Sequence, residues 1–323
     1  MNKRVSPYLR IFINAAAFYG IRLQKSDCLH KVFNEKESHH FNYSATELNT
    51  RIGRDIAKDK FLSTNVLSHF GFPVVENELV TCFDDCLAFY KKYKNVVVKP
   101  LSGSMGKGIT VGVMSQKELR RAYSLAKNSS SSQQVLVEKF IEGDDYRITV
   151  IDNKELFVSQ RVPAHIVGTG KKSIKKLIEE KNANKRDNQQ AIEFNKELLN
   201  LLKVQKVNLQ TCLGEGKTIR LKTVANISTG GMSIDVTDKI SKHFARKAIE
   251  ISKALHLKTI GIDLITTDIT GRKGKVIEIN TRPQLLSHHY PDIGRKRYPA
   301  RTILQMLFNY KLKQKKYVKT RTI

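Results

Sequence analysis

Two carboxylates and one amide lie close together near the end of the sequence. Two β-branched apolar runs, 260–265 and 276–279, flank a turn-rich stretch with two glycines, a pattern that predicts a β-hairpin. Asp263 falls in the first run, and Glu278 and Asn280 belong to the second. Because side chains alternate along a strand, Glu278 and Asn280 share a face, and Asp263 can lie opposite them. Such an oxygen-rich set suits Mg²⁺, which binds through one or two carboxylates plus substrate phosphates. The alternative is a solvated hairpin face.

A glycine-rich loop is the second feature with chemical potential. An apolar strand ends at Lys99 and Pro100, and a further strand begins at Ile109. Glycines let backbone N–H groups approach phosphate oxygens, and a lysine adds a positive charge. The loop is neither a P-loop nor a dinucleotide fingerprint, because a strand follows it instead of a helix. A flap over phosphates and a plain hairpin turn both remain open for its residues, which are Gly103, Ser104, Met105, Gly106, Lys107 and Gly108.

Length and composition indicate a soluble protein of two or three lobes. The chain has 323 residues, 40% of them hydrophobic, and no run of eighteen apolar residues that would predict a membrane helix. The basic and then apolar N-terminus resembles a signal peptide, but Tyr8, Arg10 and Asn14 interrupt the apolar run. We therefore expect this segment to form a strand and a helix of the mature protein.

Four scattered cysteines bear on metal binding and on the cellular compartment. Cys82 and Cys86 are four positions apart, but Cys28 and Cys212 do not complete a zinc-binding set with them. Buried free thiols in a reducing cytoplasm are the expected state.

The formal net charge of +27 is the strongest compositional signal. It predicts an anionic partner, which is a nucleotide, an acidic peptide, a nucleic acid or an anionic membrane surface. Nucleic acid is disfavoured because basic and aromatic residues are not interleaved and no nucleic-acid motif is present. The basic tail, 311–323, is expected to be a solvated end.

The other segments predict a mixed α and β chain that holds these groups. Helical periodicity covers 46–70, where Phe61, Leu62, Val66, Leu67 and Phe70 form an apolar stripe. His39 and His40 are expected in a solvated polar loop, and a strand with an acidic end, carrying Glu138 and Asp145, covers 134–151. Further elements are expected as a strand at 74–80 and helices at 84–94, 115–129, 173–186, 187–210, 242–257 and 299–310.

Seven motifs taken together resemble the ATP-grasp superfamily, in particular the ATP-grasp domains of cyanophycin synthetase and of the bifunctional glutathione synthetases. They span roughly residues 50–310 and are, in order, DKFLSTNVLSHFGFPV, VVVKPLSGSMGKGI, VEKFIEGDDYRITVI, RVPAHIVGTGKKSIKKLI, LKTVANISTGGMSIDVTD, GIDLI and VIEINTRPQ. The resemblance implies an α/β (α+β) fold with two lobes that hold ATP between them. The implied divisions are an N-terminal segment at 1–45, an ATP-grasp domain at 46–310 with its flap at 95–140 and its C-terminal lobe at 141–310, and the tail at 311–323.

The resemblance also implies a reaction and a role for each matching residue. ATP phosphorylates a carboxylate to an acyl phosphate, an amine attacks it to form an amide or peptide bond, and ADP and phosphate leave. Mg²⁺ is the implied metal, with Mn²⁺ as an alternative. The resemblance implies that ATP phosphates are bound by Lys60 and Lys99, and that the flap is formed by Gly103 to Gly108. It implies that adenine pairs with Glu138, Lys139 and Phe140, that ribose binds Asp145, and that the metal is held by Asp263, Glu278 and Asn280. It also implies that Arg220 lies near the γ-phosphate, that Asn226 lies in the substrate loop, and that phosphate or acid is bound by Arg147 and Arg161.

Departures from the family leave the substrates open. Nothing in the sequence matches the Mur-ligase-like half of cyanophycin synthetase or the glutamate–cysteine ligase half of the glutathione enzyme, so neither product is carried over. Arg282 and Gln284 stand where relatives usually have a small residue and Pro-Gly, and they are expected to shape a different acceptor site. His288 and His289 are expected on a pocket wall or the surface. An acidic amino acid or peptide and an amine are the expected substrates, and the alternative is a non-catalytic relic that binds a nucleotide or a polyanion. Relatives form dimers or tetramers, but the sequence favours neither.

Overall fold

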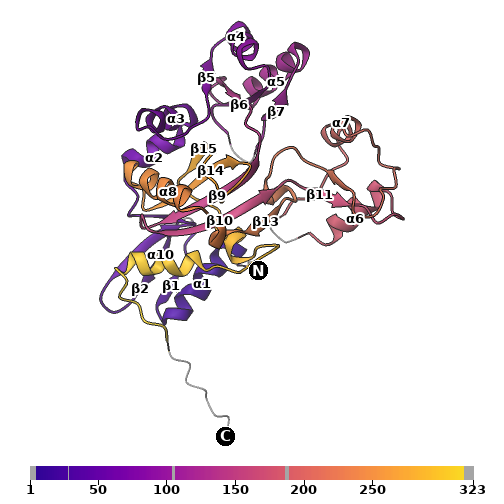
Figure 1. Ribbon diagram of the computed structural model, residues 1–323. Coiled ribbons are helices and arrows are strands. Elements are labelled where there is room, and N and C mark those ends of the chain that lie inside the picture. Colours follow the sequence, from indigo (N-terminus) through magenta and orange to yellow (C-terminus); the bar gives the residue numbers. More distant parts are fainter. Residues whose placement is uncertain (1–4, 28, 104–105, 186–188, 316–323) are drawn as a thin grey trace.

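A computed structural model of the protein describes residues 5–27, 29–103, 106–185 and 189–315. A five-stranded antiparallel sheet lies at its centre, in the strand order β13-β10-β9-β14-β15 (Figure 1). Its strands are β9 (Asp144–Ile151), β10 (Glu155–Val162), β13 (Met232–Asp235), β14 (Thr259–Thr266) and β15 (Lys275–Asn280). The last two strands form the predicted hairpin, which is thereby confirmed.

The two faces of the central sheet differ in chemistry because its strands alternate apolar and polar residues. One face carries side chains such as Ile148 and Ile262 into an apolar core that also contains residues of helix α8 (Lys242–Ala254). Helices α2 (Arg51–Lys58) and α3 (Lys60–His69) also contribute to this core. The opposite face therefore receives the charged side chains of β9, β10 and β14.

A second sheet, with the strand order β5-β8-β6-β7, lies beyond β15 (Figure 1). Its elements are β5 (Asn77–Val80), α4 (Phe83–Tyr93), β6 (Val96–Pro100), β7 (Thr110–Val113), α5 (Gln116–Ser129) and β8 (Val135–Lys139). The chain that enters β5 is tied to the central sheet, because Val75 N donates to Val276 O at 3.0 Å and Val276 N donates to Pro73 O at 2.8 Å. The two sheets are thus joined directly beside the strand that carries Glu278.

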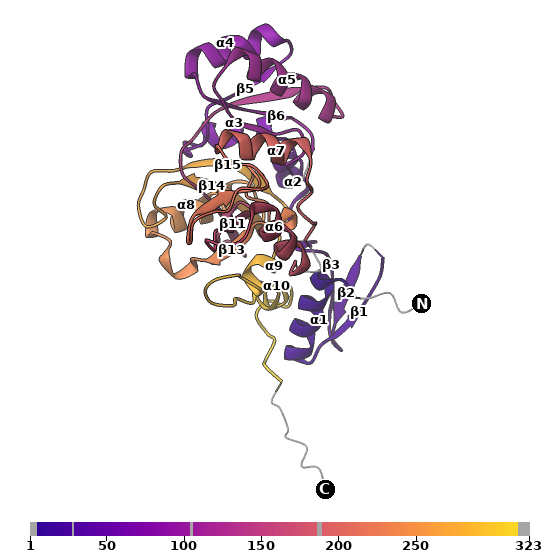
Figure 2. The same ribbon diagram turned by 90° about the vertical axis from the view of Figure 1, so that its right-hand side faces the viewer.

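Two further units complete the molecule, and Figure 2 shows the N-terminal one beside α10. This N-terminal unit contains α1 (Pro7–Tyr19), β1 (Arg22–Gln24), β2 (His30–Phe33), β3 (Ser38–Asn42) and β4 (Ala45–Thr46), and it shares an apolar core with α9 (Leu286–His289) and α10 (Pro299–Leu307). The other unit contains β11 (His165–Val167), α6 (Ile174–Ala183), α7 (Lys196–Val204) and β12 (Thr218–Arg220). Two short 3₁₀ helices, η1 (Ile227–Thr229) and η2 (Thr237–Lys239), follow β12 and β13.

The expectation of one helix over 46–70 is wrong, because two helices meet at Asp59. The backbone of Asp59 is extended, and its side chain accepts a hydrogen bond from Leu62 N at 2.9 Å, so this residue ends α2 and caps α3. The predicted apolar stripe is also only partly buried, since Leu62 and Phe70 are exposed.

Four other expectations need correction. The single strand expected over 134–151 is wrong, because β8 ends at Lys139 in the second sheet and β9 begins at Asp144 in the central sheet. The strand expected from residue 74 begins at Asn77, because the preceding backbone pairs with β15. The helix expected over 187–210 is restricted to α7, since the Asn182 side chain bonds both backbone groups of Ile192 and holds that segment outside a helix. His39 and His40 are not in a solvated loop but on β3, and His39 Nδ1 lies 2.8 Å from Glu47 Oε1.

Within the described ranges, the helices are too short or too polar to cross a membrane.

Candidate active site

The hairpin register brings the predicted oxygen ligands together on one face. Asp263 lies directly opposite Glu278, and Gly261 lies opposite Asn280. On the other side of β14, Asp263 lies opposite Arg147 of β9. One of the two carboxylates that sequence spacing placed on one face, Asp263, therefore lies next to a buried arginine, a contact that the sequence did not reveal.

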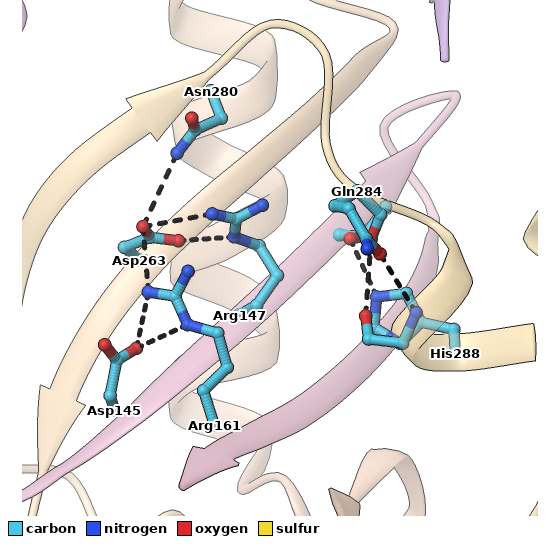
Figure 3. Close-up of polar contacts among 9 residues, drawn as sticks. Asp145, Arg147, Arg161, Asp263, Asn280, Gln284 and His288 are labelled. Carbon is cyan, nitrogen blue, oxygen red and sulfur yellow. Dashed lines mark hydrogen bonds and ion pairs between the residues drawn. The ribbon is translucent and has the colours of Figure 1, made fainter. Parts of the chain in front are cut away.

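Asp263 is the centre of a network of ion pairs (Figure 3). Arg147 donates from Nε to Asp263 Oδ1 and from Nη2 to Oδ2, the second bond at 3.1 Å. Arg161 Nη2 lies 2.9 Å from Asp263 Oδ2, and Asn280 Nδ2 donates to the same oxygen at 3.5 Å. Burial opposes ionisation, but Arg147 and Arg161 outweigh it and hold the pKa of Asp263 below its ordinary value.

Asp145 extends this network. Arg161 donates to Asp145 Oδ1 from Nε at 2.9 Å and from Nη2 at 2.6 Å. Burial raises the pKa of Asp145, and Arg161 offsets part of that rise. The residue implied to bind ribose thus pairs with one of the arginines implied to bind phosphate or acid.

These contacts bear on how well the set fits a metal ion. An ionised carboxylate offers about four lone-pair positions, and Asp263 receives four donors from Arg147, Arg161 and Asn280. Glu278 is different, because its side chain is 34% exposed and lies 3.9 Å from Lys60 Nζ. Glu278 and a turned Asn280 amide fit a hard cation such as Mg²⁺, whereas Asp263 has three of its four donors on Oδ2 and only Arg147 Nε on Oδ1. Across the described ranges, groups of three or more acidic, histidine or cysteine side chains with metal-site geometry are absent.

Lys60 connects the hairpin to the glycine-rich loop. It is the first residue of α3, directly after the cap at Asp59. Its Nζ donates to Gly103 O at 3.3 Å and lies 3.9 Å from Glu278 Oε1. Two segments that are far apart in the sequence therefore meet at one amino group.

Lys99 and Glu138 form a buried pair on neighbouring strands β6 and β8. Lys99 Nζ lies 2.6 Å from Glu138 Oε1, and each side chain is 5% exposed. Burial raises the pKa of Glu138, while the charge of Lys99 opposes that rise. The backbone near Glu138 is partly engaged as well, since Lys139 N donates to Glu76 O at 2.9 Å and Phe140 N to Asn95 O at 3.1 Å.

The glycine-rich loop forms the connection between β6 and β7. Gly106 and Gly108 adopt positive φ angles of 75° and 78°, and Lys107 is exposed. A Cβ on Gly108 would lie 2.5 Å from Ser129 Cβ, so this position requires glycine. The predicted residues Ser104 and Met105 lie outside the described residues.

Arg220 and Asn226 have structural contacts of their own. Arg220 is exposed on β12, and its backbone pairs with the Gln205 side chain at 2.9 and 3.0 Å. Asn226 caps η1 and accepts from Ser228 N at 3.1 Å. A Cβ on Gly106 would lie 3.4 Å from Val224 Cγ1, so the segment before Asn226 borders the glycine-rich loop.

The sequence did not predict that His288 contacts the polar face of the central sheet. Of the two places expected for these histidines, the surface is wrong, because His288 (Figure 3) and His289 are both buried. His288 Nε2 lies 3.0 Å from Thr149 Oγ1. Burial, with a smaller contribution from Arg147, lowers the pKa of His288 to about 3. The alternation of Asp145, Arg147 and Thr149 in β9 was the available signal, because it puts three polar side chains on one face.

Known sequences resemble this chain over most of its length. A family profile described as an ATP-grasp domain matches residues 57–285. Cyanophycin synthetase of Geminocystis herdmanii (strain PCC 6308) is 35% identical over 270 residues, which cover 80% of this chain and 31% of that protein. The glutathione biosynthesis bifunctional protein GshAB of Pasteurella multocida (strain Pm70) is 30% identical over 284 residues, which cover 83% of this chain and 37% of that protein.

A solved structure agrees with these matches. The crystal structure of a bifunctional glutathione synthetase from Pasteurella multocida superposes with a TM-score of 0.66 at 28% identity, over 90% of this chain and 42% of that one. This chain spans about a third of the length of the curated relatives it matches. The implied α/β (α+β) fold is confirmed, and the chain belongs to the ATP-grasp family.

Proposed function

We propose that the protein is an ATP-dependent carboxylate–amine ligase that forms an amide or peptide bond through an acyl phosphate and releases ADP. The observation that carries this proposal is the position of Lys60, whose Nζ lies 3.3 Å from Gly103 O and 3.9 Å from Glu278 Oε1. One cation therefore stands between the glycine-rich loop and the oxygen ligands, where phosphates need neutralisation and alignment. Membership of the ATP-grasp family supports the same reaction.

In this proposal, charged groups of the hairpin and of the strand before the glycine-rich loop bind ATP and metal. Lys60 and Lys99 hold phosphate oxygens, and Glu278 and Asn280 hold Mg²⁺ or Mn²⁺, with Asp263 joining them when Asn280 turns. The bound metal neutralises negative charge on the phosphates. Because Lys139 and Phe140 already donate their amide protons within the protein, adenine would pair with carbonyl oxygens of this segment.

An acidic substrate fits the charge of the protein. Arg147 of β9 and Arg161 of β10 lie on the polar face of the central sheet, where both pair with Asp263 of β14. Arg282 is exposed in the loop that follows β15. The net charge of +27 favours an acidic amino acid or the acidic end of a peptide over a neutral one. We place the enzyme in the cytoplasm, in line with the free thiols of the described cysteines. The expected burial holds for Cys86 but is wrong for Cys82 and Cys212, which are exposed.

The test is ADP release from ATP and Mg²⁺ with pooled amino acids and acidic peptides. Glu278→Gln is the inactive variant of choice, since Glu278 is partly exposed and its loss does not leave a buried arginine unpaired. Glu250→Gln is the matched control, because Glu250 is similarly exposed and pairs with Lys247 on α8. Turnover that requires one acid and one amine, persists in the control and disappears in Glu278→Gln supports the ligase.

A non-catalytic nucleotide-binding protein is the second candidate. The observation in its favour is Asp263, whose negative charge is already paired with Arg147 and Arg161. This candidate predicts that ADP with Mg²⁺ binds in calorimetry while no substrate pool causes ADP release. Failure to bind ADP at all would contradict both candidates.

A further inference from the structure

Two hydroxyl groups of the N-terminal unit converge on one backbone carbonyl of the distant loop 281–285. Tyr8 Oη, on α1, donates to Pro283 O at 3.1 Å, and Ser44 Oγ donates to the same oxygen at 2.7 Å. These partners are 275 and 239 positions apart. Burial raises the pKa of Tyr8 above its ordinary value, so its hydroxyl keeps the proton that it donates.

Pro283 in turn lies against the centre of the candidate active site. A Cβ on Gly261 would lie 2.9 Å from Pro283 Cβ and 3.1 Å from Arg147 Cδ. Gly261 lies opposite Asn280 in the hairpin. Pro283 and Arg147 thus pack against the same glycine, and a shift of Pro283 is transmitted to Arg147 across Gly261.

The N-terminal unit does not need these two hydroxyls to stay attached. Its residues Phe12 and Phe41 share a buried core with Leu285 and Leu304. Asn49 adds two bonds to the backbone of Thr259, at 2.8 and 2.9 Å. The two hydroxyl groups therefore add to contacts that already hold the N-terminal unit in place. Both donate to the loop 281–285, which follows β15.

We propose that Tyr8 and Ser44 are positioning residues, which fix Pro283 as one wall of the site for the carboxylate substrate. The N-terminal unit then contributes to substrate binding through the loop 281–285, without contacting ATP. A carboxylate is the class that fits, because Arg147 is the cation that packs beside this wall. This inference rests on the proposed ligase function.

The first test is hydrogen–deuterium exchange of the loop in Tyr8→Phe, Ser44→Ala and the double variant. Tyr43→Phe is the control, since Tyr43 is exposed and its ring lies 4.9 Å from that of Tyr8. We expect exchange at 281–285 to become about tenfold faster in the double variant and to stay unchanged in the control. Unchanged exchange in the double variant would overturn the proposal.

The second test separates a positioning role from general loosening of the fold. The variants should bind ADP with Mg²⁺ within about twofold of the original affinity, and KM for the carboxylate identified in the substrate screen should rise about tenfold while KM for ATP stays constant. An equal rise of both KM values would contradict a role specific to the carboxylate. If the unaltered protein turns over no substrate pool, the ligase function and the substrate-wall role fail together, whereas the exchange result still decides whether the hydroxyls fix the loop.

Discussion

Asp263 and Glu278 lie opposite each other in one hairpin, but their surroundings differ. Asp263 is buried and accepts from Arg147, Arg161 and Asn280, whereas Glu278 is about one-third exposed and has Lys60 at 3.9 Å. The first carboxylate is part of the folded framework, and the second remains accessible to a cation from solution. The comparison teaches that two ligands of one predicted metal site can contribute differently, one to stability and the other to binding.

The largest expected effect is the loss of stability in Asp263→Asn. This change leaves Arg147 and Arg161 buried with a neutral partner, and breaking a buried ion pair costs about 3–5 kcal/mol. Urea denaturation measures the free energy of unfolding. Asp55→Asn is the control, because Asp55 pairs with Arg51 at the surface, and we expect a change below about 0.5 kcal/mol there. Equal losses in both variants would contradict the framework role of Asp263.

A pH-dependent effect is expected next, from the same face of the sheet. The pKa of His288 is about 3 in the folded protein against 6.5 ordinarily, so the unfolded chain binds the extra proton between these values. Stability is therefore fully present above about pH 6.5 and is lost as pH falls towards 3, by about 2 kcal/mol at pH 5 for this residue. His289, whose pKa is about 4, adds a loss of the same sign.

We expect His288→Asn to lose about 2 kcal/mol less stability than the original protein between pH 8 and pH 5. The measurement is urea denaturation at the two pH values. His69→Asn, at an exposed position, should keep the original pH dependence. If the two variants behaved alike, the buried imidazole would not be the source of the acid sensitivity.

Gly261→Ala tests the close packing between Arg147 and the loop 281–285. The new methyl group would lie 2.9 Å from Pro283 Cβ, so Pro283 or Arg147 must move. Overpacking of this kind costs about 1–3 kcal/mol. Gly271→Ala, in the turn of the same hairpin, is the control, because its nearest neighbour is Oδ2 of the exposed Asp268 side chain at 3.0 Å instead of a buried group. A smaller loss of stability in Gly261→Ala than in Gly271→Ala would contradict the close packing of Pro283 and Arg147 against Gly261.

The smallest effect on stability is expected for Glu278→Gln, within about 0.5 kcal/mol, because Glu278 is partly exposed. ADP release should nevertheless fall about 100-fold if Glu278 holds the metal. Thermal or urea unfolding and the ADP assay are run on the same preparation. A large loss of stability without loss of turnover would reverse the comparison between the two carboxylates.

The sequence predicted well wherever the signal was local. The hairpin at 259–280 follows from β-branched runs around a glycine turn, and the shared face of Glu278 and Asn280 follows from strand alternation. Prediction failed where a side chain outweighed local propensity. Asp59 divides the expected helix, and Asn182 keeps the backbone near Ile192 out of the expected helix over 187–210.

The partners of the charged groups could not be predicted, because they come from distant parts of the chain. Arg147 and Asp263 are 116 positions apart, and Thr149 and His288 are 139 apart. Each pair forms only after the order and register of the strands are fixed. The assigned roles in ATP and metal binding remain predictions, and the ion pairs around Asp263 are what the structure adds to them.

By itself, the sequence determined the family, the hairpin and the presence of two carboxylates and an amide on one face, because motif order and strand alternation are properties of short segments. The tertiary structure decided that Asp263 pairs with arginines, that Glu278 remains accessible, and that Tyr8 and Ser44 reach Pro283. Burial and strand register, which local composition does not specify, set both the electrostatic environment and the available partners of each charged group.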